Sequence, residues 1–164
     1  MTISEAEKRR KRCCFTGHRP GKLKQSETEI KAALSEAIDQ AIQRGFRTFI
    51  TGMAQGVDLW AAELVIERKQ ANPDLHLICA IPHPGFEHSW SPDWQNRYHD
   101  VLNSADLSRI ISPHFSMSCY QKRNMWMVDH SSLLIAAFNG EPGGTRNTIQ
   151  YAQQTHVETI FIES

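Results

Sequence analysis

The sequence predicts an α/β domain in which a mainly parallel sheet lies between two layers of helices. Short apolar runs alternate with amphipathic helical patterns along nearly the whole chain, as in proteins built from strand–helix–strand units. The helices between these runs are long enough for right-handed crossovers between parallel strands. A length of 164 residues is that of one ordinary domain. We therefore expect one folded domain over residues 13–164, preceded by a basic, flexible leader over residues 1–12.

The first strand and the first long helix carry the clearest local signals. The apolar run 13–16 ends at Gly17 and predicts a strand. Ser26 precedes Glu29 in the spacing of a capping box, and apolar residues then recur at helical intervals as far as Ile42. Gly45 is placed to end this helix, because glycine readily adopts the left-handed conformation found there.

The remaining elements follow in the same alternating order. The apolar run 75–81 predicts a strand covered on both faces, and Ser91 with Pro92 predicts the start of a helix. The other expected strands lie at 46–51, 107–111, 133–138 and 157–162, and the other expected helices at 57–70, 118–130 and 145–154.

Charge is distributed unevenly along the chain. Lys+Arg and Asp+Glu are equal at 18 each, but the run Lys8-Arg9-Arg10-Lys11-Arg12 holds five of the cations. Residues 13–164 therefore carry 13 cations against 16 anions, which argues against nucleic acid as the partner. The basic run either contacts phosphate or is a solvated leader, and we expect the second.

The cysteines and the hydropathy predict where the protein works. Cys13, Cys14, Cys79 and Cys119 have neither metal-site spacing nor the pattern of a disulfide framework, so we expect free thiols and a cytoplasmic location. No apolar run approaches the ~18 residues of a spanning helix. Residues 1–12 also lack the apolar core of a signal peptide, and we expect no membrane partner.

Eight of the nine glycines follow predicted strands, where the loops of a parallel sheet gather at one edge. Glycine there lets the backbone approach a ligand, and the helices that follow favour anions at their N-termini. The loops therefore predict a cleft for a phosphate or a nucleotide, and tight strand-to-helix turns are the alternative explanation. These glycines are Gly17, Gly21, Gly52, Gly56, Gly85, Gly140, Gly143 and Gly144.

Polar side chains in the same loops strengthen this prediction. Thr16, His18 and Arg19 place a hydroxyl, an imidazole and a guanidinium within one turn. Arg19 suits bidentate pairing with phosphate, whereas His18 is equally well explained as a hydrogen-bonded structural group. Asp58 follows Gly56 directly after Val57, and it either caps the next helix or accepts hydrogen bonds from a ribose or a base.

The loop 81–88 is expected to form a wall beside the cleft. Its His83, Glu87 and His88 are of metal-binding types, but their spacing matches no compact metal motif, so we expect no metal there. Trp90 and Trp94 could stack on a base, although the helical spacing of Trp94 favours a core position. Farther along, Trp126 and Met127 suit a homodimer face and a core equally well.

Three motifs in order resemble those of a known family. They are Thr16-Gly17-His18-Arg19-Pro20, Gly52-Met53-Ala54-Gln55-Gly56-Val57-Asp58 and Pro142-Gly143-Gly144-Thr145. The chain resembles the YpsA-like proteins of the SLOG superfamily, which also contains the DNA-processing DprA/Smf proteins and the LOG phosphoribohydrolases. The resemblance extends from Cys13 to Ile162 and implies a Rossmann-like domain that binds a nucleotide or a nucleotide-derived ligand.

The resemblance to the LOG enzymes implies roles for individual residues. Their catalytic arginine corresponds to Arg123. Their glutamate after the PGG-type loop has no counterpart, because residues 145–150 contain no carboxylate. A phosphoribohydrolase needs a carboxylate to stabilise an oxocarbenium-like centre or to activate water, so Glu141 or Asp58 would have to supply it.

Three hypotheses follow for the function. The leading one is a cytosolic protein that binds a ribosylated or phosphate-bearing nucleotide derivative, as a sensor, and requires no cofactor. The second is a nucleotide N-glycosidase with Arg123, Glu141 and Asp58 as catalytic residues, and the third is a DprA-like DNA-binding module that uses the basic run 8–12. The residues expected to bind the ligand are Thr16, Gly17, His18, Arg19, Gly52, Gly56, Asp58, Arg123, Gly143, Gly144 and Thr145.

Overall fold

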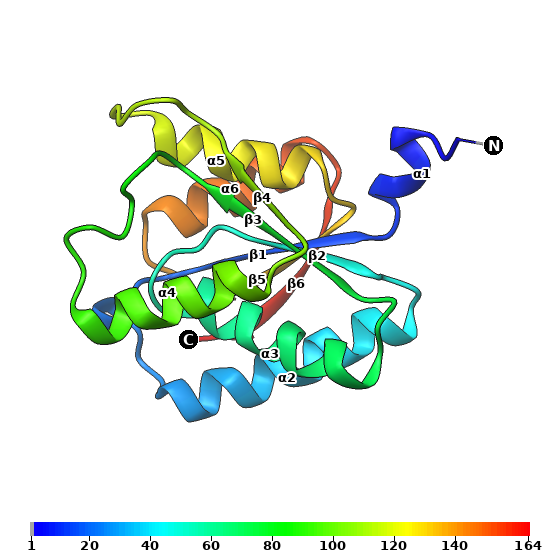
Figure 1. The fold of residues 1–164 in the computed structure, drawn as a ribbon, viewed down its shortest axis with the longest axis horizontal. Helices are drawn as coiled ribbons and strands as arrows, with labels where there is room; N and C mark the ends of the chain where they lie inside the picture. Colours follow the sequence, from blue (N-terminus) through cyan, green and yellow to red (C-terminus); the bar gives the residue numbers. More distant parts are fainter. Residues whose placement is uncertain (1) are drawn as a thin grey trace.

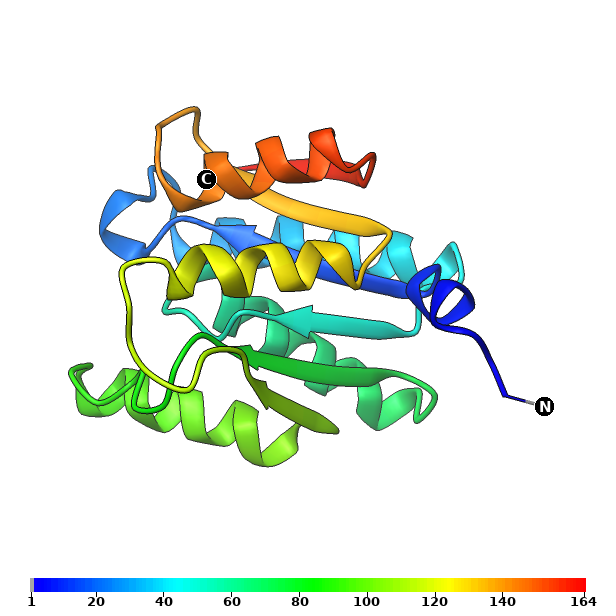
Figure 2. The same cartoon turned by 90° about the horizontal axis from the view of Figure 1, so that it is seen from above.

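Six parallel strands form one sheet in the computed structural model, which describes residues 2–164 (Figures 1 and 2). The strands are β1 (Arg12–Gly17), β2 (Thr48–Thr51), β3 (His76–Ile81), β4 (Leu107–Ile110), β5 (Leu133–Phe138) and β6 (Glu158–Glu163). Their order across the sheet is β4-β3-β2-β1-β5-β6, so the chain builds outward from β1 to β4 and then returns to place β5 on the other side of β1. This topology confirms the predicted α/β, Rossmann-like fold.

Helices cover both faces of the sheet. They are α1 (Glu5–Arg9), α2 (Glu27–Gln43), α3 (Val57–Ala71), α4 (Pro92–Ser104), α5 (Cys119–Asp129) and α6 (Gly144–Gln154), with a short 3-10 turn at Pro20–Lys22. One face packs against α2, α3 and α4, and the other packs against α5 and α6 (Figure 2). Every strand and helix predicted from the sequence is present, with ends that differ by two residues at most.

Successive side chains along a strand point to opposite faces of the sheet, so neighbouring residues lie in two separate cores. Phe15 and Phe49 lie in the core beneath α2, α3 and α4, with their rings stacked at 6.0 Å between centroids. Cys14 and Ile50 lie in the opposite core with α5 and α6. Met127 is 1% exposed and belongs to this second core, which leaves it no place on a dimer face.

The predicted helix signals are used as expected. The Ser26 hydroxyl accepts a hydrogen bond from the Glu29 N–H at 3.2 Å, and Ser91 caps α4 in the same way. Gly45 follows α2 with φ of 103°. The two serine caps satisfy N–H groups that have no partner inside the helix, and so they set where each helix begins, whereas Gly45 marks where α2 ends.

The segment expected to be a flexible leader contains the short helix α1 (Figure 1), and hydrogen bonds join this segment to the rest of the chain. Ser4 and Glu7 cap this helix reciprocally. The Arg9 side chain donates to the Ser131 carbonyl at 3.0 Å, and the Ser132 hydroxyl donates to the Arg10 carbonyl at 3.0 Å. The basic run is therefore held against the amino end of the sheet.

The four cysteines are free and buried, as expected. Burial raises the pKa of Cys14 and of Cys79 to about 12, so both side chains are uncharged thiols. In the part of the chain that the structure describes, none of the helices has the length and apolar character needed to cross a membrane.

Candidate functional site

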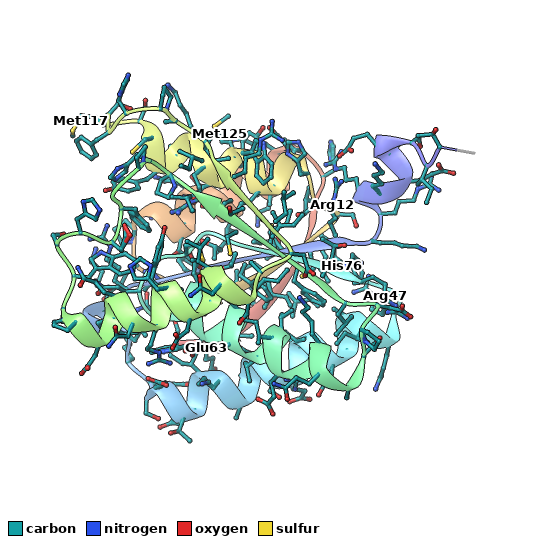
Figure 3. The ribbon with its side chains drawn as sticks, viewed as in Figure 1. Arg12, Arg47, Glu63, His76, Met117 and Met125 are labelled. Carbon is teal, nitrogen blue, oxygen red and sulfur yellow. The ribbon has the colours of Figure 1, made fainter. Side chains whose placement is uncertain are left out.

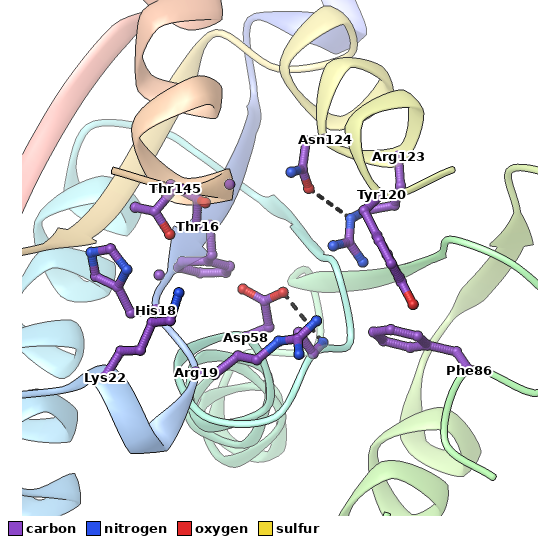
Figure 4. Close-up of a pocket in the computed structure, with 15 residues that line it drawn as sticks. Thr16, His18, Arg19, Lys22, Asp58, Phe86, Tyr120, Arg123, Asn124 and Thr145 are labelled. Carbon is purple, nitrogen blue, oxygen red and sulfur yellow. Dashed lines mark hydrogen bonds between the residues drawn. The ribbon is translucent and has the colours of Figure 1, made fainter. Parts of the chain in front are cut away.

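Loops that follow β1, β2, β3 and β5 meet around a pocket of about 410 Å³ (Figure 4). The pocket lies at the carboxyl edge of the sheet, where the strand order reverses between β1 and β5, and open parallel sheets bind ligands at this place. Its volume is that of a small-molecule site. The lining residues are Phe15, Thr16, Gly17, His18, Arg19, Lys22, Ala54, Asp58, Phe86, Tyr120, Arg123, Asn124, Gly143, Gly144 and Thr145.

Most of the residues predicted to bind a ligand come together at this pocket. Gly52 and Gly56 are not among the lining residues and instead lie behind them. Glu141, one of the two carboxylates expected to serve catalysis, is exposed and also lies outside the lining. The predicted residues that line the pocket are Thr16, Gly17, His18, Arg19, Asp58, Arg123, Gly143, Gly144 and Thr145.

Gly52 allows Asp58 and Arg123 to approach the same stretch of backbone. A Cβ atom on Gly52 would lie 2.7 Å from Oδ2 of Asp58 and 3.0 Å from Cζ of Arg123. Nη1 of Arg123 also donates a hydrogen bond to the Gly52 carbonyl oxygen. Any side chain at position 52 would therefore displace one or both of these groups from the pocket.

Asp58 and Arg123 are buried ionisable groups, each 6% exposed. Asp58 lies in the first turn of α3 and not at its N-cap, which is Gly56, and its Oδ2 accepts a hydrogen bond from the Ala54 N–H at 3.3 Å. Burial raises the pKa of Asp58 to about 6, although Arg123 and the Ala54 N–H oppose the rise. Burial likewise lowers the pKa of Arg123. The pocket thus contains a carboxyl group whose pKa lies well above its ordinary value.

His18 lines the pocket and has an unpaired ring nitrogen. The residue is 5% exposed, its ring stacks on Phe138 at 5.8 Å, and its Nε2 atom is buried with no hydrogen-bond partner among residues 2–164. Burial lowers the pKa of His18. Buried polar atoms in proteins are normally hydrogen-bonded, so the unpaired Nε2 favours a ligand-binding role over a structural one.

The N-terminus of α6 opens onto the same pocket. Its N-cap, Gly143, has φ of 142° and supplies no side-chain cap. The first N–H to bond back along the helix is that of Asn147, which donates to the Gly143 carbonyl. The N–H groups of Gly144, Thr145 and Arg146 are therefore without helical acceptors. Such free N–H groups, together with the helix dipole, favour an anion.

An aromatic wall lies on one side of the pocket. Phe86 comes from the loop 81–88, which was expected to form a wall beside the cleft, although Phe86 itself was not predicted as a lining residue, and neither was Tyr120. The rings of Phe86 and Tyr120 lie 5.8 Å apart, and the Arg123 guanidinium lies 5.8 Å from the Phe86 ring centre. Tyr120, Arg123 and Asn124 are at positions i, i+3 and i+4 of α5, so helical spacing from Arg123 would have identified both neighbours. The lining residues not predicted are Phe15, Lys22, Ala54, Phe86, Tyr120 and Asn124.

The other candidate side chains are placed by aromatic packing. His83 lies edge-on to Phe86, with ring centroids 5.7 Å apart. Trp94 packs on Trp60 at 6.3 Å, which agrees with its helical spacing, and Trp90 lines a smaller hollow of about 310 Å³ beside the pocket. Across residues 2–164, His, Cys, Asp and Glu side chains form no group of three that could hold a metal ion.

Comparisons with known proteins agree with the resemblance seen in the motifs. The YpsA model, described as the YspA SLOG family, matches residues 13–162. The uncharacterized SPbeta prophage-derived protein YoqJ of Bacillus subtilis is 32% identical over 142 residues, which cover 79% of this chain and 83% of YoqJ. A UPF0398 protein of Halalkalibacterium halodurans is 31% identical over 120 residues, which cover 72% of this chain but only 64% of that relative.

Two solved structures of DNA processing protein A (DprA) have a similar fold. The Streptococcus pneumoniae protein has a TM-score of 0.67 and 15% identity, over 94% of this chain and 51% of that chain. The Helicobacter pylori protein, whose structure describes a single-stranded DNA binding mode, has a TM-score of 0.63 and 15% identity, over 93% of this chain and 65% of that chain. The chain thus spans about half to two thirds of these proteins.

Proposed function

The chain belongs to the YpsA SLOG family, and from this premise we propose that its carboxyl-edge pocket binds the phosphate and ribose of a nucleotide or nucleotide-derived ligand. The observation that supports this most directly is the buried, unpaired Nε2 of His18 in a pocket that also receives the N-terminus of α6. An unsatisfied buried polar group costs about 1–3 kcal/mol. A phosphate oxygen bound between His18 and α6 would remove that cost.

The charge of the lining also supports an anionic ligand. Arg19, Lys22 and Arg123 are cations, and Asp58 is the carboxylate among the lining residues. Arg19 and Lys22 are exposed at the mouth of the pocket, so they can reach a phosphate without prior rearrangement. Arginine pairs with phosphate through two parallel hydrogen bonds, which gives direction as well as affinity.

The aromatic wall supports a ring at the other end of the ligand. Phe86 and Tyr120 are each half-buried, and each leaves part of its ring facing the pocket. Stacking of a base on an aromatic side chain contributes about 1–3 kcal/mol and is tolerant of base identity. The expected orientation places the phosphate between His18, Arg19 and α6, and the base against Phe86 and Tyr120.

Thermal unfolding in the presence of AMP, ADP-ribose and NAD tests this proposal. A ligand at one hundred times its Kd adds about 2.7 kcal/mol of stability, which raises the Tm of a chain this long by roughly 5–10 °C. Arg19→Ala should weaken binding about 10- to 100-fold, because it removes a charge-assisted hydrogen bond. Lys24→Ala, a nearby exposed cation outside the pocket, should bind as the unmodified protein does. No Tm change with any of the three ligands would contradict the proposal.

One observation favours a second candidate function, a nucleotide N-glycosidase. Asp58 lines the pocket with a pKa of about 6, whereas Glu141 is exposed outside it. In this reaction water adds to C1′ of the ribose while the bond from C1′ to the base nitrogen breaks. The base leaves with that electron pair and takes up a proton, and Asp58 can hold the proton lost by the water.

Release of free base from nucleoside monophosphates, followed by chromatography, tests the glycosidase. Asp58→Asn should lower the rate about 10²- to 10⁴-fold, the usual contribution of general acid–base catalysis. Glu141→Gln should leave the rate unchanged. A slower rate in Glu141→Gln with an unchanged rate in Asp58→Asn would transfer the role to Glu141. No release of base by the unmodified protein would restrict the pocket to binding.

A further inference from the structure

The amino end of the sheet carries a second hollow, of about 820 Å³, at the edge opposite to the pocket. It lies between α1 and the first residues of β1 to β4, and Figure 3 shows Arg12, His76 and Arg47 on the same side of the molecule as α1. Its cations are Lys8, Arg10, Lys11, Arg12 and Arg47, and its carboxylates are Glu7, Asp74 and Asp106. Asp106 is paired with Lys69 at 2.6 Å, and Glu7 caps α1. Its apolar side chains are Ile3, Ile78 and Leu107.

The hollow exists because no helix covers this part of the sheet in the described chain. Arg12, Thr48 and His76 are register neighbours on β1, β2 and β3, so their side chains form one row on the same face. Ile78 pairs with Leu107 in a second row, and Leu107 is 54% exposed. The helices α5 and α6 pack on the same face and form a core that Ile78 also contacts, but they do not line the hollow.

Three cations of the hollow are free to bind a partner. Arg12 is paired with Glu5 at 2.5 Å, and the guanidinium of Arg47 donates to two backbone carbonyls. By contrast, no side-chain hydrogen bond or ion pair engages Lys8, Arg10 or Lys11 within residues 2–164. All three residues are exposed, which leaves their charges available.

The backbone that carries these cations is fixed in place. The Lys11 carbonyl accepts hydrogen bonds from the N–H groups of Arg47 and Thr48, at 3.0 and 3.1 Å. The Arg10 carbonyl accepts a hydrogen bond from the Ser132 hydroxyl. A charged segment that is already ordered loses less conformational entropy on binding than a free tail does.

We propose that this hollow binds single-stranded nucleic acid through its phosphates, as a role separate from that of the carboxyl-edge pocket. The hollow combines free cations with the apolar side chains Ile78 and Leu107, and a single strand likewise combines phosphates with unpaired bases. Residues 13–164 carry a net negative charge, which repels a polyanion from the rest of the surface and directs it to the basic run. The proposal gives the basic run a phosphate-binding role, whereas the sequence analysis expected a solvated leader and no nucleic-acid partner.

Fluorescence anisotropy with a fluorescein-labelled oligothymidylate of about 20 nucleotides tests this inference. Neutralisation of three phosphates predicts a slope of about −2 for log affinity against log salt, or roughly 20-fold weaker binding between 50 and 200 mM NaCl. The triple variant Lys8→Gln, Arg10→Gln, Lys11→Gln should bind at least about tenfold more weakly at low salt and with a flatter slope. The matched variant Lys24→Gln, Arg109→Gln, Lys122→Gln removes the same charge from exposed sites elsewhere and should bind within about twofold of the unmodified protein.

Other results would overturn the inference. Equal weakening in the two triple variants would mean that net charge alone governs binding. Loss of binding in Arg19→Ala with full binding in the Lys8, Arg10, Lys11 variant would place the strand in the carboxyl-edge pocket. Displacement of the oligonucleotide by poly-L-glutamate at equal charge would assign the hollow to acidic proteins. Because nucleotide binding by the pocket is measured separately with AMP, failure here would leave that proposal intact.

Discussion

Asp58→Asn is expected to stabilise the ligand-free protein by about 3 kcal/mol at pH 7.5. The pKa of Asp58 is about 6 in the folded protein and 3.8 when unperturbed, so the folded state binds the proton more tightly than the unfolded state. Stability must therefore fall as pH rises from about 4 to about 6, and it stays low above that range. Asparagine resembles the protonated carboxyl and removes this loss.

Urea unfolding at several pH values between 4 and 7.5 measures the effect as the difference between the two proteins, which cancels other titrating groups. The difference should be close to zero at pH 4 and largest above pH 6. Asp100→Asn, the same change at an exposed site of α4, should alter stability by less than about 0.5 kcal/mol at every pH. If the Asp58 variant is no more stable than the unmodified protein at pH 7.5, folding does not raise the pKa of Asp58.

A stabilising Asp58→Asn has a functional meaning. Proteins keep destabilising ionisable groups mainly where binding or chemistry requires them. Asp58 would then be retained for its proton or its charge in the pocket, and the same variant should show impaired ligand binding or base release. Greater stability with reduced function separates this role from a purely structural one.

Gly17→Ala should destabilise the protein by about 3 kcal/mol, at the upper end of the usual range for overpacking. A Cβ atom on Gly17 would lie within 2.6 Å of three side-chain carbons of Val57. Val57 is fully buried and is the first residue of α3, so it cannot move aside without shifting the helix. The substitution forces β1 and α3 apart at the pocket.

Gly21→Ala is the matched control, because a Cβ atom there meets nothing within 4 Å. It should change stability by less than about 1 kcal/mol and can stabilise, since alanine reduces the entropy of the unfolded chain. In a Val57→Gly background the cost of Gly17→Ala should shrink, as a double-mutant cycle from urea unfolding would show. Equal costs of Gly17→Ala in both backgrounds would rule out the contact with Val57 as the cause.

The fold and the position of the site could be predicted because both depend on patterns local in sequence. Ser26, Gly45 and Ser91 are capping signals that act within one turn, and each marks a helix end as expected. The meeting of the glycine loops follows from parallel topology alone, since all strands then end at the same edge. Gly17 and Gly143 reach the pocket for this reason.

The details of the site depend on contacts between distant segments, which no local pattern contains. Gly52 matters because Asp58 and Arg123 both lie beside it. Arg123 is 71 residues away from Gly52 in the sequence. Phe86 and Tyr120 form the aromatic wall only after β3 and α5 are placed side by side. The attachment of α1 likewise rests on Arg9 reaching Ser131, 122 residues away.

The complete burial of the four native thiols has a practical consequence. Because Cys13, Cys14, Cys79 and Cys119 are all 0% exposed, maleimide reagents have no ready target in the native protein. A cysteine introduced at Lys22 or at Lys11 would then be the preferred site of labelling, without prior removal of the natural ones. A dye attached to one of these cysteines would report ligand binding at that edge of the sheet alone, so two singly labelled proteins would follow the two edges separately.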